Sequence, residues 1–121
     1  MTAARWRAVA AAYAVLLLIA ALIPEPPAAP RIPHLDKAVH LCEYLLFAWL
    51  LRRTLAGSPA GRSALRAFAA ATLYGLALEL LQRLVPWRSA DMADAVFNAL
   101  GAALGVAVNH PDKTQNSRGT L

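Results

Sequence analysis

The sequence predicts an all-α fold, specifically an integral membrane bundle of four transmembrane helices with both termini on the cytoplasmic side (N-in/C-in). Two observations support this prediction: the composition and the spacing of four apolar segments. Hydrophobic residues make up 59% of the 121 residues and charged residues only 16%, whereas soluble domains have about 45–50% and about 25% respectively. A water-soluble domain of this size exposes too much surface to remain so apolar. The composition therefore excludes a disordered chain and favours a membrane protein.

Four apolar segments follow one another along the chain, at residues 8–23, 36–51, 65–85 and 91–108. A spanning helix needs roughly 20 residues, within a range of about 17–25, so the third and fourth segments are long enough. The first is long enough if Trp6 and Arg7 lie at the membrane interface, and the second if its charged start forms a polar end. A cleaved signal peptide is the alternative for the first segment, because Arg5 and Arg7 resemble its positively charged start. The three apolar segments that follow favour an uncleaved first span.

The connections between the segments differ in kind. Residues 24–35 contain five of the eight prolines and predict an extended loop. Residues 56–61 predict a turn rich in glycine and proline, and Pro86 ends the third segment. We expect one four-helix domain over residues 1–109, followed by a polar, disordered cytoplasmic tail over residues 110–121. The single cysteine, Cys42, excludes an intramolecular disulfide.

The basic residues gather at one end of the predicted bundle. With four spans, the N-terminus, the connection after the second segment and the C-terminus share one side of the membrane. Because Lys and Arg stay cytoplasmic in short loops, this side is predicted to be the cytoplasm. The net charge of +5 is then a topology signal assisted by anionic lipids, and no recognition motif supports nucleic acid as a partner. Eight of the twelve basic residues lie on this side: Arg5, Arg7, Arg52, Arg53, Arg62, Arg66, Lys113 and Arg118.

Most other charged residues lie at the outward end, where the second segment begins, the third ends and the fourth begins. His40 is spaced i,i+4 from both Asp36 and Tyr44, so these three share one helix face. Polar residues of the third and fourth segments share faces with glycines, which allow a neighbouring helix to approach closely. An ionisable group at mid-helix costs about 2.5–3.5 kcal/mol on insertion, so several together predict a function. The candidates are Asp36, Lys37, His40, Tyr44, Glu79, Gln82, Arg88, Asp94 and Asn98.

Structural roles are the alternative at several positions of this end. Asp91 is expected to cap the fourth helix at its N-terminus. Lys37, Arg83 and Trp87 are suited to anchor helix ends at the membrane interface. Glu79 lies deeper than an interface anchor, and a buried carboxylate needs a partner. The partners expected for it are Arg83, Arg88 and His40.

Three motifs occur in order along residues 36–105. They are Asp36-Lys37-x-x-His40-x-x-x-Tyr44, then Tyr74-Gly75-x-x-x-Glu79-x-x-Gln82-x-x-Val85-Pro86-x-Arg88, then Asp91-x-x-Asp94-x-x-x-Asn98-x-x-Gly101-x-x-x-Gly105. This order closely resembles the VanZ-like family of small bacterial membrane proteins. The resemblance implies a multi-pass protein of the bacterial cytoplasmic (inner) membrane that acts in the cell envelope. It also points to glycopeptide resistance, since the founding member of the family is associated with resistance to teicoplanin.

The first functional hypothesis is an accessory protein that binds an outward-facing ligand. The ligand would be a lipid-linked or glycopeptide-like molecule, for example a peptidoglycan precursor. A small transporter is supported least, because the polar residues gather at one end and do not cross the bilayer. The residues expected to contact the ligand are Lys37, Tyr44, Gln82, Arg88, Asp94 and Asn98.

The alternative is a membrane hydrolase or phosphatase that acts on a lipid phosphate of the outer leaflet. Asp36 and Glu79 would serve as nucleophile or general base and His40 as the proton shuttle, so these three are the catalytic candidates. No cofactor is predicted. If a divalent metal ion is present, its ligands are expected among Asp36, His40, Glu79 and Asp94.

Overall fold

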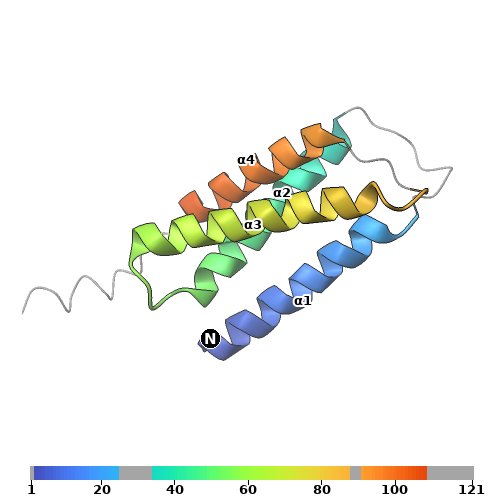
Figure 1. The fold of residues 1–121 in the computed structure, drawn as a ribbon. Coiled ribbons are helices and arrows are strands. Elements are labelled where there is room, and N and C mark those ends of the chain that lie inside the picture. Colours follow the sequence, from blue (N-terminus) through green and yellow to red (C-terminus); the bar gives the residue numbers. More distant parts are fainter. Residues whose placement is uncertain (1, 25–33, 88–90, 109–121) are drawn as a thin grey trace, which may run out of the picture.

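A computed structural model describes residues 2–24, 34–87 and 91–108 of the chain. Within these ranges the protein consists of four α-helices and contains no β-strand, which confirms the all-α prediction. The helices alternate in direction along the bundle, and Figure 1 shows their arrangement. They are α1 (Ala3–Leu22), α2 (Leu35–Thr54), α3 (Ala60–Gln82) and α4 (Met92–Val108). Residues 25–33 of the predicted proline-rich loop and the whole predicted tail lie outside the described residues, whereas Leu35, predicted as part of the loop, is the first residue of α2.

The helix boundaries differ from the predicted ones mainly in α1 and α3. Helix α1 begins at Ala3 instead of residue 8, so it includes Arg5, Trp6 and Arg7. The other difference is in α3. This helix begins at Ala60 instead of residue 65, because the turn after α2 needs only the residues from Leu55 to Pro59. Gly61, which suggested a turn, therefore lies in the first turn of α3, where the Ser63 hydroxyl donates to the Ala60 carbonyl at 2.9 Å. The helix ends at Gln82, before the predicted residue 85, since Pro86 cannot continue it.

Two of the four helices are long and apolar enough to cross a membrane. They are α1, with 20 residues, and α3, with 23 residues. The apolar helix α4 has 17 residues and is shorter, and α2 carries charged residues at both of its ends. Large hydrophobic side chains are exposed along α1, α3 and α4, including Leu16, Leu65, Leu73 and Val96. An outer surface of this kind is typical of helices that contact lipid.

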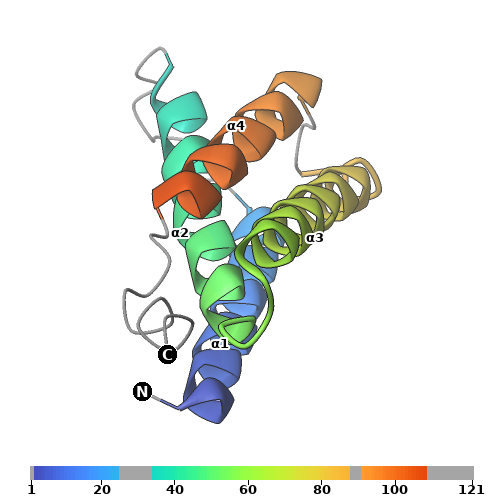
Figure 2. The same cartoon turned by 90° about the vertical axis from the view of Figure 1, so that its left-hand side faces the viewer.

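Helix α2 lies at the centre of the bundle. It packs on α1, α3 and α4, whereas α1 and α4 lie on opposite sides of the α2–α3 pair (Figure 2). The closest approach is between α2 and α4. A Cβ atom at Gly101 would overlap the carbonyl oxygen of Leu41, and one at Gly105 would overlap that of Leu45. The two glycines therefore allow the backbones of α2 and α4 to touch, as their spacing predicts.

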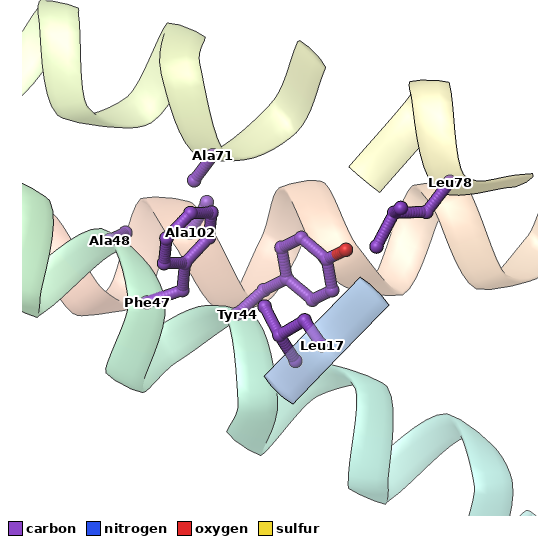
Figure 3. Packing of buried hydrophobic residues seen from close by; sticks show 7 residues of the cluster. All are labelled: Leu17, Tyr44, Phe47, Ala48, Ala71, Leu78 and Ala102. Atoms are coloured by element: carbon purple, nitrogen blue, oxygen red, sulfur yellow. The ribbon is translucent and has the colours of Figure 1, made fainter. Parts of the chain in front are cut away.

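The apolar core lies where α2 meets the other three helices. Figure 3 shows the rings of Tyr44 and Phe47 surrounded by small and branched side chains of α1, α3 and α4. The centroid of the Phe47 ring lies 5.2 Å from that of Tyr74 and 5.8 Å from that of Tyr13. Aromatic pairs at this separation add to the stability that burial supplies. The buried cluster contains Leu17, Tyr44, Phe47, Ala48, Ala71, Leu78 and Ala102.

Polar contacts fix which helix ends meet. At the end where α2 finishes, Arg52 donates to Ser63 of α3 at 3.3 Å and to the Val106 carbonyl of α4. At the other end, Gln82 donates to the Ala21 carbonyl at 3.0 Å and Trp87 donates to the Leu22 carbonyl at 2.8 Å. The starts of α2 and α4 therefore lie at the same end of the bundle as the finish of α3, which is where the sequence predicts the site.

Candidate functional site

A lysine network joins the first turn of α2 to the start of α4. The Lys37 ammonium donates to Asp94 Oδ1 at 2.7 Å, to Asp91 Oδ2 at 2.8 Å and to Asp36 Oδ2 at 3.2 Å. An ammonium group has three protons, so these three carboxylates use its full donor capacity. Its side chain is only 17% exposed. Lys37 therefore holds three acidic side chains together and does not present its charge outward.

Asp91 combines two structural roles at the start of α4. Its Oδ1 accepts a hydrogen bond from the Ala93 backbone at 3.0 Å, which is the expected N-terminal cap. Its Oδ2 accepts from Lys37, and this hydrogen bond lowers the pKa of the Asp91 carboxyl below its ordinary value of 3.8. Because the pKa is lower in the folded chain, the contact stabilises folding at higher pH. That contribution is lost as the pH falls below 3.8 through the folded value.

A second layer of contacts lies deeper in the bundle, around His40. The imidazole Nε2 lies 3.5 Å from Asp94 Oδ2, and the imidazole Nδ1 lies 3.0 Å from Asn98 Oδ1. Asp94 and Asn98 lie one helical turn apart on α4, so both face His40 on α2. Asp94 thus bridges the two layers, since one oxygen accepts from Lys37 and the other faces His40.

Helix α3 contributes a buried carboxylate to the same place. Glu79 is 2% exposed, and its Oε2 atom is buried without a hydrogen-bond partner. One potential ligand atom each from His40, Glu79 and Asp94 lies within 4.8 Å of the others. Below we call these three residues the trio. Of the partners expected for Glu79, His40 is adjacent, whereas the structure shows no ion pair from Glu79 to Arg83, which is also described.

The structure brings most of the sequence-predicted residues to one end of the bundle, in a group that we call the polar cluster. Tyr44 and Asn98 lie over Gly75, where a Cβ atom would be 2.8 Å from the Tyr44 ring and 3.0 Å from the Asn98 amide nitrogen. Gln82 is buried but donates its amide to α1. Arg88 lies outside the described residues. The polar cluster consists of Asp36, Lys37, His40, Glu79, Asp91, Asp94 and Asn98.

Two features of the site escaped the sequence analysis. Asp91 was expected to cap α4 and was not among the candidate site residues, yet it is also a partner of Lys37. The signal was present in its i,i+3 spacing to Asp94, which places both carboxylates on one helix face. Gln82 and Trp87 attach α1 through its backbone carbonyls. No sequence pattern predicts such contacts, because every residue carries a backbone carbonyl and the acceptor could therefore be any residue.

The four alternating helices, two of them long and apolar enough to cross a membrane, and the polar cluster at one end indicate an all-helical membrane protein. The model of the VanZ/LLP1 family matches residues 6–110, and the chain belongs to this family. The match confirms the resemblance found in the motifs of residues 36–105 and extends it over α1. No curated protein sequence and no solved structure matches the chain significantly.

Proposed function

We propose that the chain is a multi-pass protein of the bacterial cytoplasmic membrane with four spans and both termini in the cytoplasm. In this arrangement the polar cluster lies at the outward ends of α2, α3 and α4, where it binds a ligand of the cell envelope. The ligand is a lipid-linked precursor or a glycopeptide-like molecule, and the binding contributes to glycopeptide resistance. Family membership and the apolar outer surface of the helices support this proposal.

One observation supports a binding role above a purely structural one: the buried Glu79 carboxylate retains an unpartnered oxygen. Polar groups that only hold helices together satisfy one another, because burying an unpaired acceptor costs free energy. The contacts of Lys37, Asp91 and Asn98 fit such a structural role. Glu79 differs from them, and its unused oxygen is available to a bound group.

The charge of the polar cluster indicates which part of a ligand would fit. Lys37 is already engaged by Asp36, Asp91 and Asp94, so the carboxylates, chiefly Glu79, are the charged groups left for a ligand. The cluster is therefore suited to groups that donate hydrogen bonds, namely the hydroxyls of sugars and the amides and amines of peptides. Peptidoglycan precursors and glycopeptides both present such groups. In the proposal, Arg88 contacts a phosphate or carboxylate of the same ligand.

The experiment is complementation of a deletion strain, read out as teicoplanin susceptibility. Wild-type protein is expected to restore resistance, whereas Glu79→Gln and His40→Ala are expected to leave susceptibility at the level of the deletion strain. The amount of each variant in the membrane fraction is measured in parallel. Glu43→Gln is the matched control, because Glu43 lies on α2 outside the polar cluster and the substitution removes the same charge. Full complementation by Glu79→Gln at wild-type abundance contradicts the proposal.

A membrane hydrolase remains a second candidate because of one specific contact. The buried Glu79 carboxylate and His40 lie side by side, which is the arrangement of a general base with a proton shuttle. In that case the purified protein releases phosphate from a lipid phosphate in detergent micelles, and Glu79→Gln abolishes the release. Absence of phosphate release by the wild-type protein, with and without Mg²⁺, rejects this candidate.

A further inference from the structure

We propose that His40, Glu79 and Asp94 bind a divalent metal ion with borderline ligand preference, namely Mn²⁺ or Zn²⁺. The ion sits where α2, α3 and α4 meet, and each helix supplies one ligand. The use of the ion in binding an envelope ligand rests on the proposed function. Ion binding itself does not, because it can be measured on the purified chain alone.

The geometry of the trio is close to that of a metal site. Its three potential ligand atoms lie within 4.8 Å of one another. Protein nitrogen and oxygen ligands bind such ions at about 2.0–2.2 Å, so two ligands of one ion lie up to about 4.4 Å apart. Small rotations of the Glu79 and Asp94 side chains are enough to bring all three atoms onto one ion.

The hydrogen bond from His40 to Asn98 determines which imidazole nitrogen faces the trio. An amide oxygen only accepts hydrogen bonds, so the contact of Nδ1 with Asn98 Oδ1 at 3.0 Å places a proton on Nδ1. In a neutral imidazole Nε2 then carries a lone pair, and it faces Asp94 Oδ2 at 3.5 Å. Metal-binding histidines have this arrangement, in which the outer nitrogen donates to an oxygen that fixes the ring.

Glu79 provides independent evidence that a cation belongs at this place. It is 2% exposed, and its Oε2 atom has no hydrogen-bond partner. The imidazole of His40 and the carboxylate of Asp94 lie next to it, so potential ligand atoms from three helices converge beside this unpartnered oxygen. Buried charges in proteins are paired or coordinate metals. A positive ion at the centre of the trio satisfies all three acceptors at once.

Charge and ligand type indicate which ion fits. Two carboxylates and a neutral imidazole carry a total charge of −2, which balances a divalent ion. Imidazole suits Zn²⁺, whereas carboxylates suit Mn²⁺, so a mixed set favours these two ions over Mg²⁺ or Ca²⁺. Lys37 holds the second oxygen of Asp94 and Asn98 holds His40. These contacts orient the ligands, as the outer partners of metal ligands usually do.

The test is metal binding by the full chain in detergent micelles after removal of metals with a chelator. Mn²⁺ binding is measured from the loss of the free-ion signal in electron paramagnetic resonance, and Zn²⁺ binding by calorimetry. We expect one saturable site per chain with at least one of the two ions. His40→Ala and Glu79→Gln are expected to abolish it, and Asn98→Ala to weaken it by about 10–100-fold. Glu43→Gln is expected to bind like the wild type.

The folding of each variant is checked by far-UV circular dichroism and by gel filtration in the same detergent. A proton is the competing occupant, since a charged His40 between two carboxylates would also satisfy the trio. The proposal is overturned if the wild-type protein binds neither ion saturably, or if folded Glu79→Gln binds with wild-type affinity. A variant that no longer binds the ion but still confers teicoplanin resistance would confirm the metal site. It would also show that the proposed function does not use the ion.

Discussion

Asp94 connects the two layers of the polar cluster. Its Oδ1 accepts from Lys37, its Oδ2 faces His40, and its side chain is only 13% exposed. Asp36 contacts the same lysine at a longer distance and is 62% exposed. Water screens an exposed ion pair and weakens it, whereas a hydrogen bond to a charged group is stronger when it is shielded. The two aspartates therefore differ in their expected contribution to stability although both bond to Lys37.

This difference predicts the effect of removing each carboxylate. Asp94→Ala is expected to lower the free energy of unfolding by about 1.5–3 kcal/mol, because a shielded charged hydrogen bond is lost. Asp36→Ala is expected to cost no more than about 1 kcal/mol. Both are measured by SDS unfolding from mixed micelles in the presence of a chelator, so that metal binding does not contribute. Equal losses for the two variants would contradict the arrangement around Lys37.

At the scale of the elements, α2 and α4 define the site because their backbones touch. Gly101 and Gly105 face the carbonyl oxygens of Leu41 and Leu45, which lie one helical turn apart on α2. This contact lies directly below the polar cluster, and it fixes how far His40 on α2 lies from Asp94 and Asn98 on α4. Helix α3 packs against both α2 and α4 at Gly75, where the missing side chain leaves room for Tyr44 and Asn98.

A side chain at the helix contact is expected to separate α2 from α4. Gly101→Ala places a methyl group against backbone atoms that cannot rotate away, so overpacking is expected to cost about 1–3 kcal/mol or more. Gly61→Ala is the matched control, since its Cβ would have no atom within 4 Å. That substitution is expected to be neutral or to stabilise α3 by up to about 1 kcal/mol. SDS unfolding of both variants measures the difference, and equal stability would reject the close contact.

At the scale of the whole molecule, the alternating helices separate two chemically different ends. The polar cluster lies at one end, with α1 attached there through Gln82 and Trp87. The other end carries arginines, of which Arg52 joins α2, α3 and α4 and Arg53 lies over the rings of Trp6 and Trp49. Basic and aromatic residues of this kind are typical of a cytoplasmic membrane interface.

This separation predicts the accessibility of each end from outside the cell. In a Cys42→Ser background, Leu35→Cys at the start of α2 is expected to react with a membrane-impermeant maleimide added to spheroplasts. Ser58→Cys, in the turn between α2 and α3, is expected to react only after the membrane is permeabilised. The opposite labelling pattern would invert the proposed orientation. Labelling of both positions in sealed spheroplasts would reject the four-span arrangement.

Much of the site could be predicted because helical spacing fixes which residues share a face. His40 lies on the α2 face that meets α4, and Asp94 and Asn98 lie together on the facing surface of α4. The start of α3 was harder to locate, because Gly61 is tolerated in a first helical turn as readily as in a loop. The roles of Gln82 and Trp87 could not be predicted, since their partners are backbone carbonyls of α1.

The helical class, the order of the apolar segments and the set of polar residues at one end can be read from the amino-acid sequence. These properties follow from the composition and from the spacing of residues within one helix, and both are local features of the sequence. The packing of the helices, in contrast, is needed to see that Lys37 binds three carboxylates and that Glu79 keeps an unpartnered oxygen beside His40. Apart from the contact between Lys37 and Asp36, these contacts join residues of different helices. Their distances depend on how closely the helix backbones approach. The volume of the side chains at the helix contacts sets that approach.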